Sequence, residues 1–239
     1  NVGFELEAGS LLAIIGPNGA GKSTTFNMVG GQLRPDRGQV ILAGEDITGL
    51  PPRAIWRRGV GRTFQVAQTF PSMSALENVQ MALISLAGRS RAFRPRAADL
   101  YRAEALDLLR AVGMAEAAAR PGSELAYGDV KRVELAVALA GGPKLLLMDE
   151  PTAGMAPKER AALMELTARI ARERGIGVLF TEHDMDAVFS HADRILVLVR
   201  GEIIAAGTPA EVRADARVKQ VYLGETGHAA AEEAGRARA

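Results

Sequence analysis

The sequence predicts an α/β fold with a mostly parallel sheet, and three observations support this. Apolar runs typical of buried strands occur at residues 11–15, 144–150 and 177–183. Segments with the apolar spacing of helices, such as residues 158–174, separate these runs. A glycine-rich turn leads directly from the first run into a predicted helix. Strands that alternate with helices form parallel sheets, which bind ligands at the carboxyl ends of their strands.

The glycine-rich turn matches the phosphate-binding pattern G-x-x-x-x-G-K-[ST] in the strand-loop-helix context that the pattern requires. Glycines let backbone N–H groups turn inward around phosphate oxygens, and the start of the next helix adds the positive end of its dipole. Lys22 would reach the outer phosphates as a point charge, and the Ser23 hydroxyl would bind Mg²⁺. The predicted nucleotide-binding residues of this segment are Gly16, Pro17, Asn18, Gly19, Ala20, Gly21, Lys22, Ser23 and Thr24.

The composition limits the class of protein. With 29 basic and 28 acidic side chains the formal net charge is +1, which gives no electrostatic case for a nucleic acid as partner. The absence of cysteine excludes disulfides and thiolate metal sites. No apolar run approaches the roughly 20 residues of a membrane-spanning helix, and the first ten residues lack the basic cluster of a signal peptide. We therefore expect a cytosolic protein.

The rest of the chain predicts further elements in order. Residues 2–6, 39–44 and 59–65 are expected to be strands. A helical block over residues 70–121 contains a helix capped by Ser74 or Asn78, a second helix at 97–112 and a short continuation at 114–120. Another helix ends at residues 141–143, and a turn at Arg200-Gly201 joins strands at 194–198 and 202–205.

Both chain ends carry their own expectations. Short helices are expected near residues 208–212 and 218–223, and residues 225–239 have nothing to pack and are predicted to be disordered. The chain lacks an initiator Met and begins inside a predicted strand. We therefore expect natural sequence to precede Asn1.

Polar side chains follow several predicted strands. Asp149 and Glu150 end one strand, Gln65 ends a second and His183 ends a third. Asp149 can hold Mg²⁺, and Glu150 can orient and polarise the attacking water. The amide of Gln65 can bind both the Mg²⁺ and that water. Each has an ordinary alternative, since an acidic pair is often only a helix N-terminal charge and a lone histidine is more often structural. Four such residues beside a phosphate loop favour nucleotide hydrolysis.

These motifs resemble the ATP-binding subunits of ABC transporters over about residues 2–224. Gly16–Ser23 matches the Walker A loop, Gln65 the Q-loop, and residues 145–150 the Walker B strand with its catalytic glutamate. Residues 125–129 stand in the place of the signature motif, and residues 182–184 in that of the switch histidine. The resemblance implies a P-loop NTPase of ABC type, with antiparallel β strands beside the parallel sheet. It also implies a RecA-like core at 1–69 and 142–224 and an inserted helical subdomain at 70–141.

The resemblance also implies the site and its partners. It implies that Glu150, His183 and Gln65 are the catalytic residues. It also implies that Ser23, Gln65 and Asp149 bind Mg²⁺. Two copies, identical or paralogous, would bind head to tail around two ATP molecules. Each ATP would contact the phosphate loop of one copy and the signature segment of the other, which comprises Leu125, Ala126, Tyr127, Gly128 and Asp129. Permease subunits would hold the ATPase at the cytoplasmic face of the inner membrane as a peripheral protein.

Several residues depart from the family pattern. Ala126 replaces the signature serine and removes a hydroxyl contact to the γ-phosphate, and Tyr127 and Asp129 are also uncommon at their positions. Ala156 stands where most relatives carry aspartate, which removes a usual cross-dimer hydrogen bond. The aromatic residue that usually stacks on adenine would precede Val2. We therefore expect weaker ATP affinity in this chain than in one that carries the preceding segment.

The motif details favour one branch of the family and leave alternatives. The signature Leu-Ala-Tyr-Gly, the strand end Thr63-Phe64-Gln65 and residues 182–186 resemble ATPases of branched-chain amino acid importers. Relatives that import urea or short amides, or export lipopolysaccharide, are alternatives, because in this family the ATPase does not touch the solute. A second class of function is a clamp that binds ATP without hydrolysing it, and a third is an ATPase of DNA repair or translation.

Overall fold

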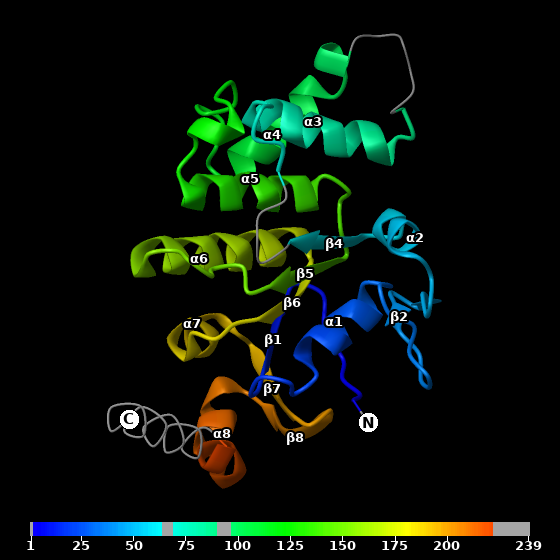
Figure 1. Cartoon of the computed structure of the whole chain (residues 1–239), viewed down its shortest axis with the longest axis vertical. Coiled ribbons are helices and arrows are strands. Elements are labelled where there is room, and N and C mark those ends of the chain that lie inside the picture. Colours follow the sequence, from blue (N-terminus) through cyan, green and yellow to red (C-terminus); the bar gives the residue numbers. More distant parts are fainter. Residues whose placement is uncertain (1, 64–68, 90–96, 222–239) are drawn as a thin grey trace, which may run out of the picture.

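The computed structural model of the chain describes residues 2–63, 69–89 and 97–221 (Figure 1). The predicted site residue Gln65 and the predicted disordered tail at 225–239 lie outside these described residues. None of the described helices has both the length and the apolar character that crossing a membrane requires.

A six-stranded sheet forms the centre of the molecule, in the spatial order β4-β5-β6-β1-β7-β8. All neighbouring strands run parallel except β7 and β8, which pair antiparallel. The strands are β1 (Leu11–Ile15), β4 (Val60–Thr63), β5 (Leu145–Asp149), β6 (Gly177–Thr181), β7 (Arg194–Val199) and β8 (Glu202–Gly207). A separate antiparallel pair joins β2 (Ile41–Leu42) and β3 (Glu45–Asp46). The prediction of an α/β fold with a mostly parallel sheet and antiparallel additions is confirmed.

The central strands are buried on both faces, which explains their continuous apolar sequence. Along β1, Leu11, Ala13 and Ile15 enter one core cluster, whereas Leu12 and Ile14 enter the other. Successive side chains of a strand point to opposite faces, so both clusters need apolar residues at adjacent positions. The larger cluster joins the sheet to helices α3, α5 and α6, and the smaller joins it to α1.

Helices cover the sheet and extend beyond one end of it. Figure 1 shows α3, α4 and α5 gathered at one end of the molecule, with α6 and the sheet between α5 and α1. The helices are α1 (Lys22–Val29), α2 (Pro52–Arg57), α3 (Ala75–Leu86), α4 (Arg102–Ala111), α5 (Tyr127–Leu139), α6 (Pro157–Arg174), α7 (Met185–His191) and α8 (Pro209–Ala214). Residues 97–99 and 122–124 form short 3₁₀ turns.

Some local predictions were wrong. Residues 2–6 form no strand, although Val2, Phe4 and Leu6 pack against the smaller core cluster. The strand expected at 39–44 shrinks to two residues because Ala43 and Gly44 take positive φ angles in a tight turn. Residues 114–120 form turns instead of a helix.

The cap of α3 is Ser74 and not Asn78. The Ser74 hydroxyl accepts from the Glu77 N–H, and the Glu77 carboxylate accepts from the Ser74 N–H, which makes a capping box. Asn78 is buried inside α3, and its side chain forms hydrogen bonds with the backbone of Phe70 in the loop before the helix.

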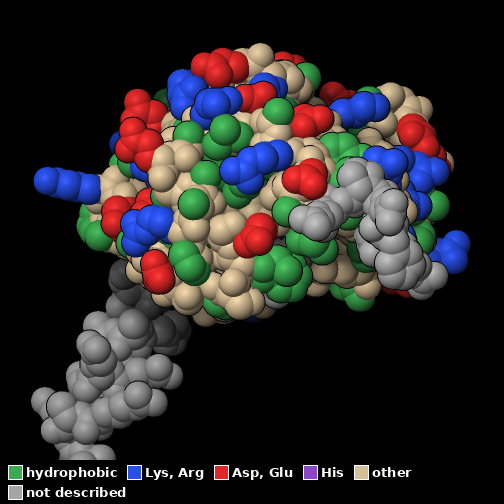
Figure 2. All heavy atoms as spheres, turned by 90° about the horizontal axis from the view of Figure 1, so that it is seen from above, with side chains coloured by type: hydrophobic (Ala, Val, Ile, Leu, Met, Phe, Trp, Pro, Cys, Tyr) green, Lys and Arg blue, Asp and Glu red, His purple; other side chains and the backbone are tan. Residues whose placement is uncertain are grey.

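The surface at the end of the molecule formed by α3, α4 and α5 carries interspersed acidic and basic side chains. Neither sign of charge dominates the face seen in Figure 2.

Candidate functional site

The phosphate loop leaves β1 at Ile15 and enters α1 at Lys22. Gly16 takes a φ of 150°, and a Cβ atom there would lie 2.1 Å from the backbone oxygen of Leu198 in β7. The loop therefore passes so close to the neighbouring strand that only glycine fits. Gly19 and Gly21 also have positive φ angles. The glycines of the pattern thus bend the chain tightly between strand and helix.

Lys22 and the start of α1 face the loop. The Lys22 ammonium donates to the carbonyl oxygens of Gly16 at 2.6 Å and Pro17 at 3.1 Å. No side chain caps the first turn of α1, whose N-cap is Gly21. Ser23 and Thr24 in that turn are exposed, whereas Thr25 turns back to bond the Gly21 carbonyl oxygen. An ammonium group, an uncapped helix start and an accessible hydroxyl are the donors and ligands that a phosphate with Mg²⁺ needs.

The acidic pair lies at the carboxyl end of β5, next to the end of β6. Asp149 is in register with Thr181, and the Thr181 hydroxyl donates to Asp149 Oδ1 at 2.8 Å. The Glu150 N–H donates to the same hydroxyl at 3.1 Å and to the Thr181 carbonyl oxygen at 3.2 Å. The buried side chain of Thr181 therefore fixes both acids relative to β6.

Glu150 and His183 are in direct contact. His183 Nε2 lies 2.8 Å from Glu150 Oε1, although the two residues are 33 positions apart in sequence. Glu150 takes a φ of 47°, an unusual angle for a residue other than glycine, as the chain turns away from β5. This turn aims its carboxylate at the loop after β6. A carboxylate held by an imidazole in this way can orient a water and accept its proton.

Arg62 of β4 provides positive charge beside Asp149. Its guanidinium lies 3.9 Å from Asp149 Oδ2 and donates to the side chain of Asn27 in α1 at 3.1 Å. Burial lowers the pKa of Arg62, and the Asp149 carboxylate opposes this shift. Arg62 therefore connects the acidic strand end to the helix that follows the phosphate loop.

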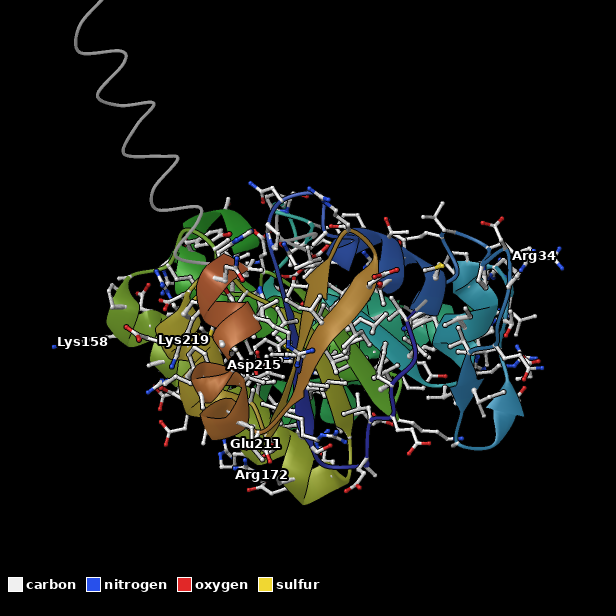
Figure 3. The ribbon with its side chains drawn as sticks, turned by 90° about the horizontal axis from the view of Figure 1, so that it is seen from below. Arg34, Lys158, Arg172, Glu211, Asp215 and Lys219 are labelled. Carbon is white, nitrogen blue, oxygen red and sulfur yellow. The ribbon has the colours of Figure 1, made fainter. Side chains whose placement is uncertain are left out.

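The segment Leu125–Asp129 forms the start of α5, in a different part of the fold from α1 (Figure 1). Ala126 is the N-cap and supplies no side-chain hydrogen bond. The Tyr127 side chain is partly exposed, and the Lys131 ammonium lies 5.9 Å from the centre of its ring. Partial burial, together with the negative charge of Glu134, raises the pKa of the Tyr127 hydroxyl. Gly128 packs beside the carboxylate of Glu159 in α6, and Lys158 next to it points outward from the edge of the molecule (Figure 3).

The structure thus sorts the predicted site residues into two groups. Asp149, Glu150 and His183 lie at adjacent strand ends, and the phosphate loop follows β1, the other neighbour of β6. The segment Leu125–Asp129 stands apart at the start of α5, and Gln65 lies outside the described residues.

Sequence reasoning missed several residues that organise the site. Thr181 and Arg62 contact the acidic pair, and Thr152 and Glu182 join the loops after β5 and β6. Glu182 was visible in the sequence beside His183, but its partner could not be read because the register of β5 against β6 is a tertiary property.

Comparison with known families gives two matches. A model described as "ABC transporter" matches residues 1–153, and one described as "Branched-chain amino acid ATP-binding cassette transporter" matches residues 202–228.

Curated relatives cover nearly the whole chain. The chain is 40% identical to the high-affinity branched-chain amino acid transport ATP-binding protein LivG of Salmonella typhimurium, over 94% of this chain and 91% of the relative. It is 41% identical to the protein of the same description, BraF, from Pseudomonas aeruginosa, with the same coverage. The lipopolysaccharide export system ATP-binding protein LptB of Haemophilus influenzae is 36% identical over 94% of this chain and 90% of its own.

Solved structures agree in fold. The ADP conformation of an ATP-binding cassette of an ABC transporter superposes with a TM-score of 0.81 at 31% identity, covering 92% of this chain and 89% of the other. A dimeric post-hydrolysis cassette bound to ADP and Pi superposes with a TM-score of 0.72 at 28% identity, over 87% and 89% of the two chains.

Proposed function

The chain belongs to the ABC transporter family of ATP-binding proteins, and from this premise we propose that it hydrolyses ATP to power an importer of branched-chain amino acids. The observation that carries hydrolysis is the contact between Glu150 and His183 at the ends of β5 and β6. A module that only binds nucleotide has no need of a carboxylate held by an imidazole at this place.

ATP binding is assigned to the phosphate loop. Its glycines leave room for phosphate oxygens against the backbone, and Lys22 exchanges the carbonyl oxygens of Gly16 and Pro17 for the outer phosphates. Ser23 and Asp149, with Gln65 as a further predicted ligand, would hold Mg²⁺, which neutralises charge on the β- and γ-phosphates. The bond from Thr181 keeps Asp149 oriented for this task.

Hydrolysis is assigned to Glu150. Its carboxylate orients a water in line with the γ-phosphate and accepts a proton from it as the water oxygen bonds to the γ-phosphorus, while the bond from that phosphorus to the bridging oxygen breaks and ADP leaves. His183 Nε2 lies 2.8 Å from that carboxylate, and we assign this histidine a contact with the γ-phosphate as well. Gln65 remains a predicted partner of the same water.

The second half of the site comes from another copy. The start of α5 offers N–H groups without a side-chain cap, and Gly128 lets a phosphate approach them closely. We assign the segment Leu125–Asp129 to the ATP of the opposite copy in a head-to-tail dimer. The similarity to a dimeric cassette bound to ADP and Pi supports this assignment.

The solute and the partners are assigned from the relatives. The described relatives serve branched-chain amino acid transport, and the match at residues 202–228 is specific to such transporters. We therefore place the chain on permease subunits at the cytoplasmic face of the inner membrane. In this assignment residues 70–141 form the helical subdomain that transmits movement, and residues 1–69 and 142–224 form the core.

Phosphate release from Mg-ATP tests the hydrolysis. We expect steady turnover by the full chain and a loss of at least about 100-fold for Glu150→Gln, with ATP binding retained. A chain that binds ATP but releases no phosphate would instead be the non-hydrolysing clamp. For the solute, reconstitution with the permease should give ATP-dependent leucine uptake. Lipopolysaccharide extraction in its place would favour the exporter branch, which the similarity to LptB represents.

A further inference from the structure

The loop between β5 and α6 is fastened to the loop after β6 by a buried carboxylate. Glu182 Oε1 accepts from the Thr152 N–H at 2.9 Å and from the Thr152 hydroxyl at 2.6 Å. Only 6% of Glu182 and 1% of Thr152 is exposed. A buried carboxylate is costly unless hydrogen bonds satisfy it, and the two Thr152 donors supply such bonds here.

The place of this contact links it to the acid and the imidazole. Glu182 stands between Thr181, which bonds Asp149 and the Glu150 N–H, and His183, which contacts the Glu150 carboxylate. Thr152 lies two residues beyond Glu150. The Glu182–Thr152 contact therefore closes a small ring of interactions whose other side is the Glu150–His183 pair.

A second connection holds the far end of the same loop. Arg160 of α6 donates to the Met155 carbonyl oxygen at 3.3 Å and forms an ion pair with Asp184. Asp184 in turn caps α7 through the N–H groups of Asp186 and Ala187. Because this end is fixed independently, loss of the Glu182 contact would free the loop mainly near Glu150.

We propose that Glu182 is a positioning residue for the hydrolysis reaction. It fixes the spacing between the loops after β5 and β6, and so keeps the Glu150 carboxylate against His183. This inference rests on the proposed hydrolysis. Glu182 acts through the position of its oxygen and not through its charge, since its partners among the described residues are the two neutral donors of Thr152.

Three substitutions separate position from charge. Glu182→Gln keeps an acceptor oxygen at the same reach without charge. Glu182→Asp keeps the charge but withdraws the oxygen by one methylene, and Glu182→Ala removes the acceptor. We expect kcat within about threefold of the unsubstituted chain for Glu182→Gln and about 10- to 100-fold lower for the other two. The KM for ATP should stay within about twofold, because the phosphate loop is untouched.

The matched control is Glu116→Ala, which removes an exposed glutamate from a turn in the helical block. It should leave kcat and KM unchanged. Thermal unfolding of every variant shows whether the fold is intact.

The outcomes divide cleanly. No phosphate release by the unsubstituted chain would defeat the proposed function itself. With an active chain, the inference is overturned if folded Glu182→Asp retains full kcat, if Glu182→Gln falls as far as Glu182→Asp, or if kcat and KM change together. Unfolding of both Glu182→Asp and Glu182→Ala would also overturn it, because the contact would then serve stability alone.

Discussion

Gly16 in the phosphate loop and Gly128 at the start of α5 meet very different surroundings. A Cβ atom at Gly16 would lie 2.1 Å from the Leu198 backbone oxygen, and the φ of 150° is one that other residues rarely adopt. The nearest atoms to a Cβ atom at Gly128 would be those of the Glu159 carboxylate, at an ordinary contact distance of 3.4 Å. The fold requires the first glycine, whereas no contact among the described residues requires the second.

The difference shows how the two halves of the proposed nucleotide site are made. The phosphate loop, the acidic pair and His183 are held by contacts inside one chain. Within the part of the chain that the structure describes, no side chain caps the start of α5 and no neighbour of Gly128 demands glycine there. Such a segment is understandable if its N–H groups and its glycine serve a nucleotide on another copy.

Gly16→Ala should have the largest effect on stability. The new methyl group has to displace backbone, so we expect a loss of about 3 kcal/mol or more in the free energy of unfolding. Gly19→Ala is the matched control, because Gly19 has a φ of 76° but no atom within 4 Å of an added Cβ. It should cost about 1–2 kcal/mol from backbone strain alone. Denaturant unfolding compares the two, and equal losses would show that β7 does not confine the loop.

Gly128→Ala should separate stability from activity. In an α-helix alanine is favoured over glycine, so the free energy of unfolding should stay the same or rise by up to about 1 kcal/mol. Phosphate release should fall about 10-fold or more, since the methyl group fills the space between Gly128 and the Glu159 carboxylate, next to the helix start that we assign to the second copy's phosphate. Unfolding and phosphate-release assays on the same preparation measure both quantities.

The matched control for Gly128→Ala is Gly3→Ala, which adds a methyl group in open space without a positive φ. It should change neither quantity. Full phosphate release by Gly128→Ala would show that the start of α5 has no part in the reaction.

The contrast between the two glycines also marks what the sequence could reveal. The strands, the phosphate loop and the acids at the strand ends were predictable because apolar runs and motif spacing are local signals. The partners of Asp149 and Glu150 were not, because Thr181 and His183 become their neighbours only through the register of β5 against β6. The prediction of a strand at residues 2–6 was wrong because apolar side chains at alternate positions also occur in an extended segment that packs on the core without pairing with another strand.

The N-caps of α3 and α5 sharpen the comparison with a smaller effect. Ser74 and Ala126 share nearly the same backbone angles, with φ of −66° and −62° and ψ of 162° and 152°. Only Ser74 carries a side chain that can cap. Ser74→Ala should therefore cost about 1 kcal/mol in the free energy of unfolding, and Ala126→Ser should recover a similar amount. Denaturant unfolding measures the change in the free energy of unfolding for each variant. A destabilising Ala126→Ser would mean that a serine hydroxyl does not bond the first N–H groups of α5.

The smallest expected effect is a pH dependence of the α3 cap. Hydrogen bonds from the Ser74 N–H and hydroxyl lower the pKa of Glu77 below its ordinary value. A carboxyl group whose pKa is lower in the folded state stabilises the fold fully above its unfolded pKa, and this stabilisation is lost as the pH falls through the folded value. The stability difference between the unsubstituted chain and Glu77→Gln should therefore be largest at pH 7 and shrink below about pH 4.5. Denaturant unfolding at pH 7 and at about pH 3.5 measures this difference. The capping box of Thr208 and Glu211 in α8 is the same in both variants, so its own pH dependence cancels from the difference. A difference that grew on acidification would have the opposite sign, and would show that the Ser74 bonds favour the protonated carboxyl group.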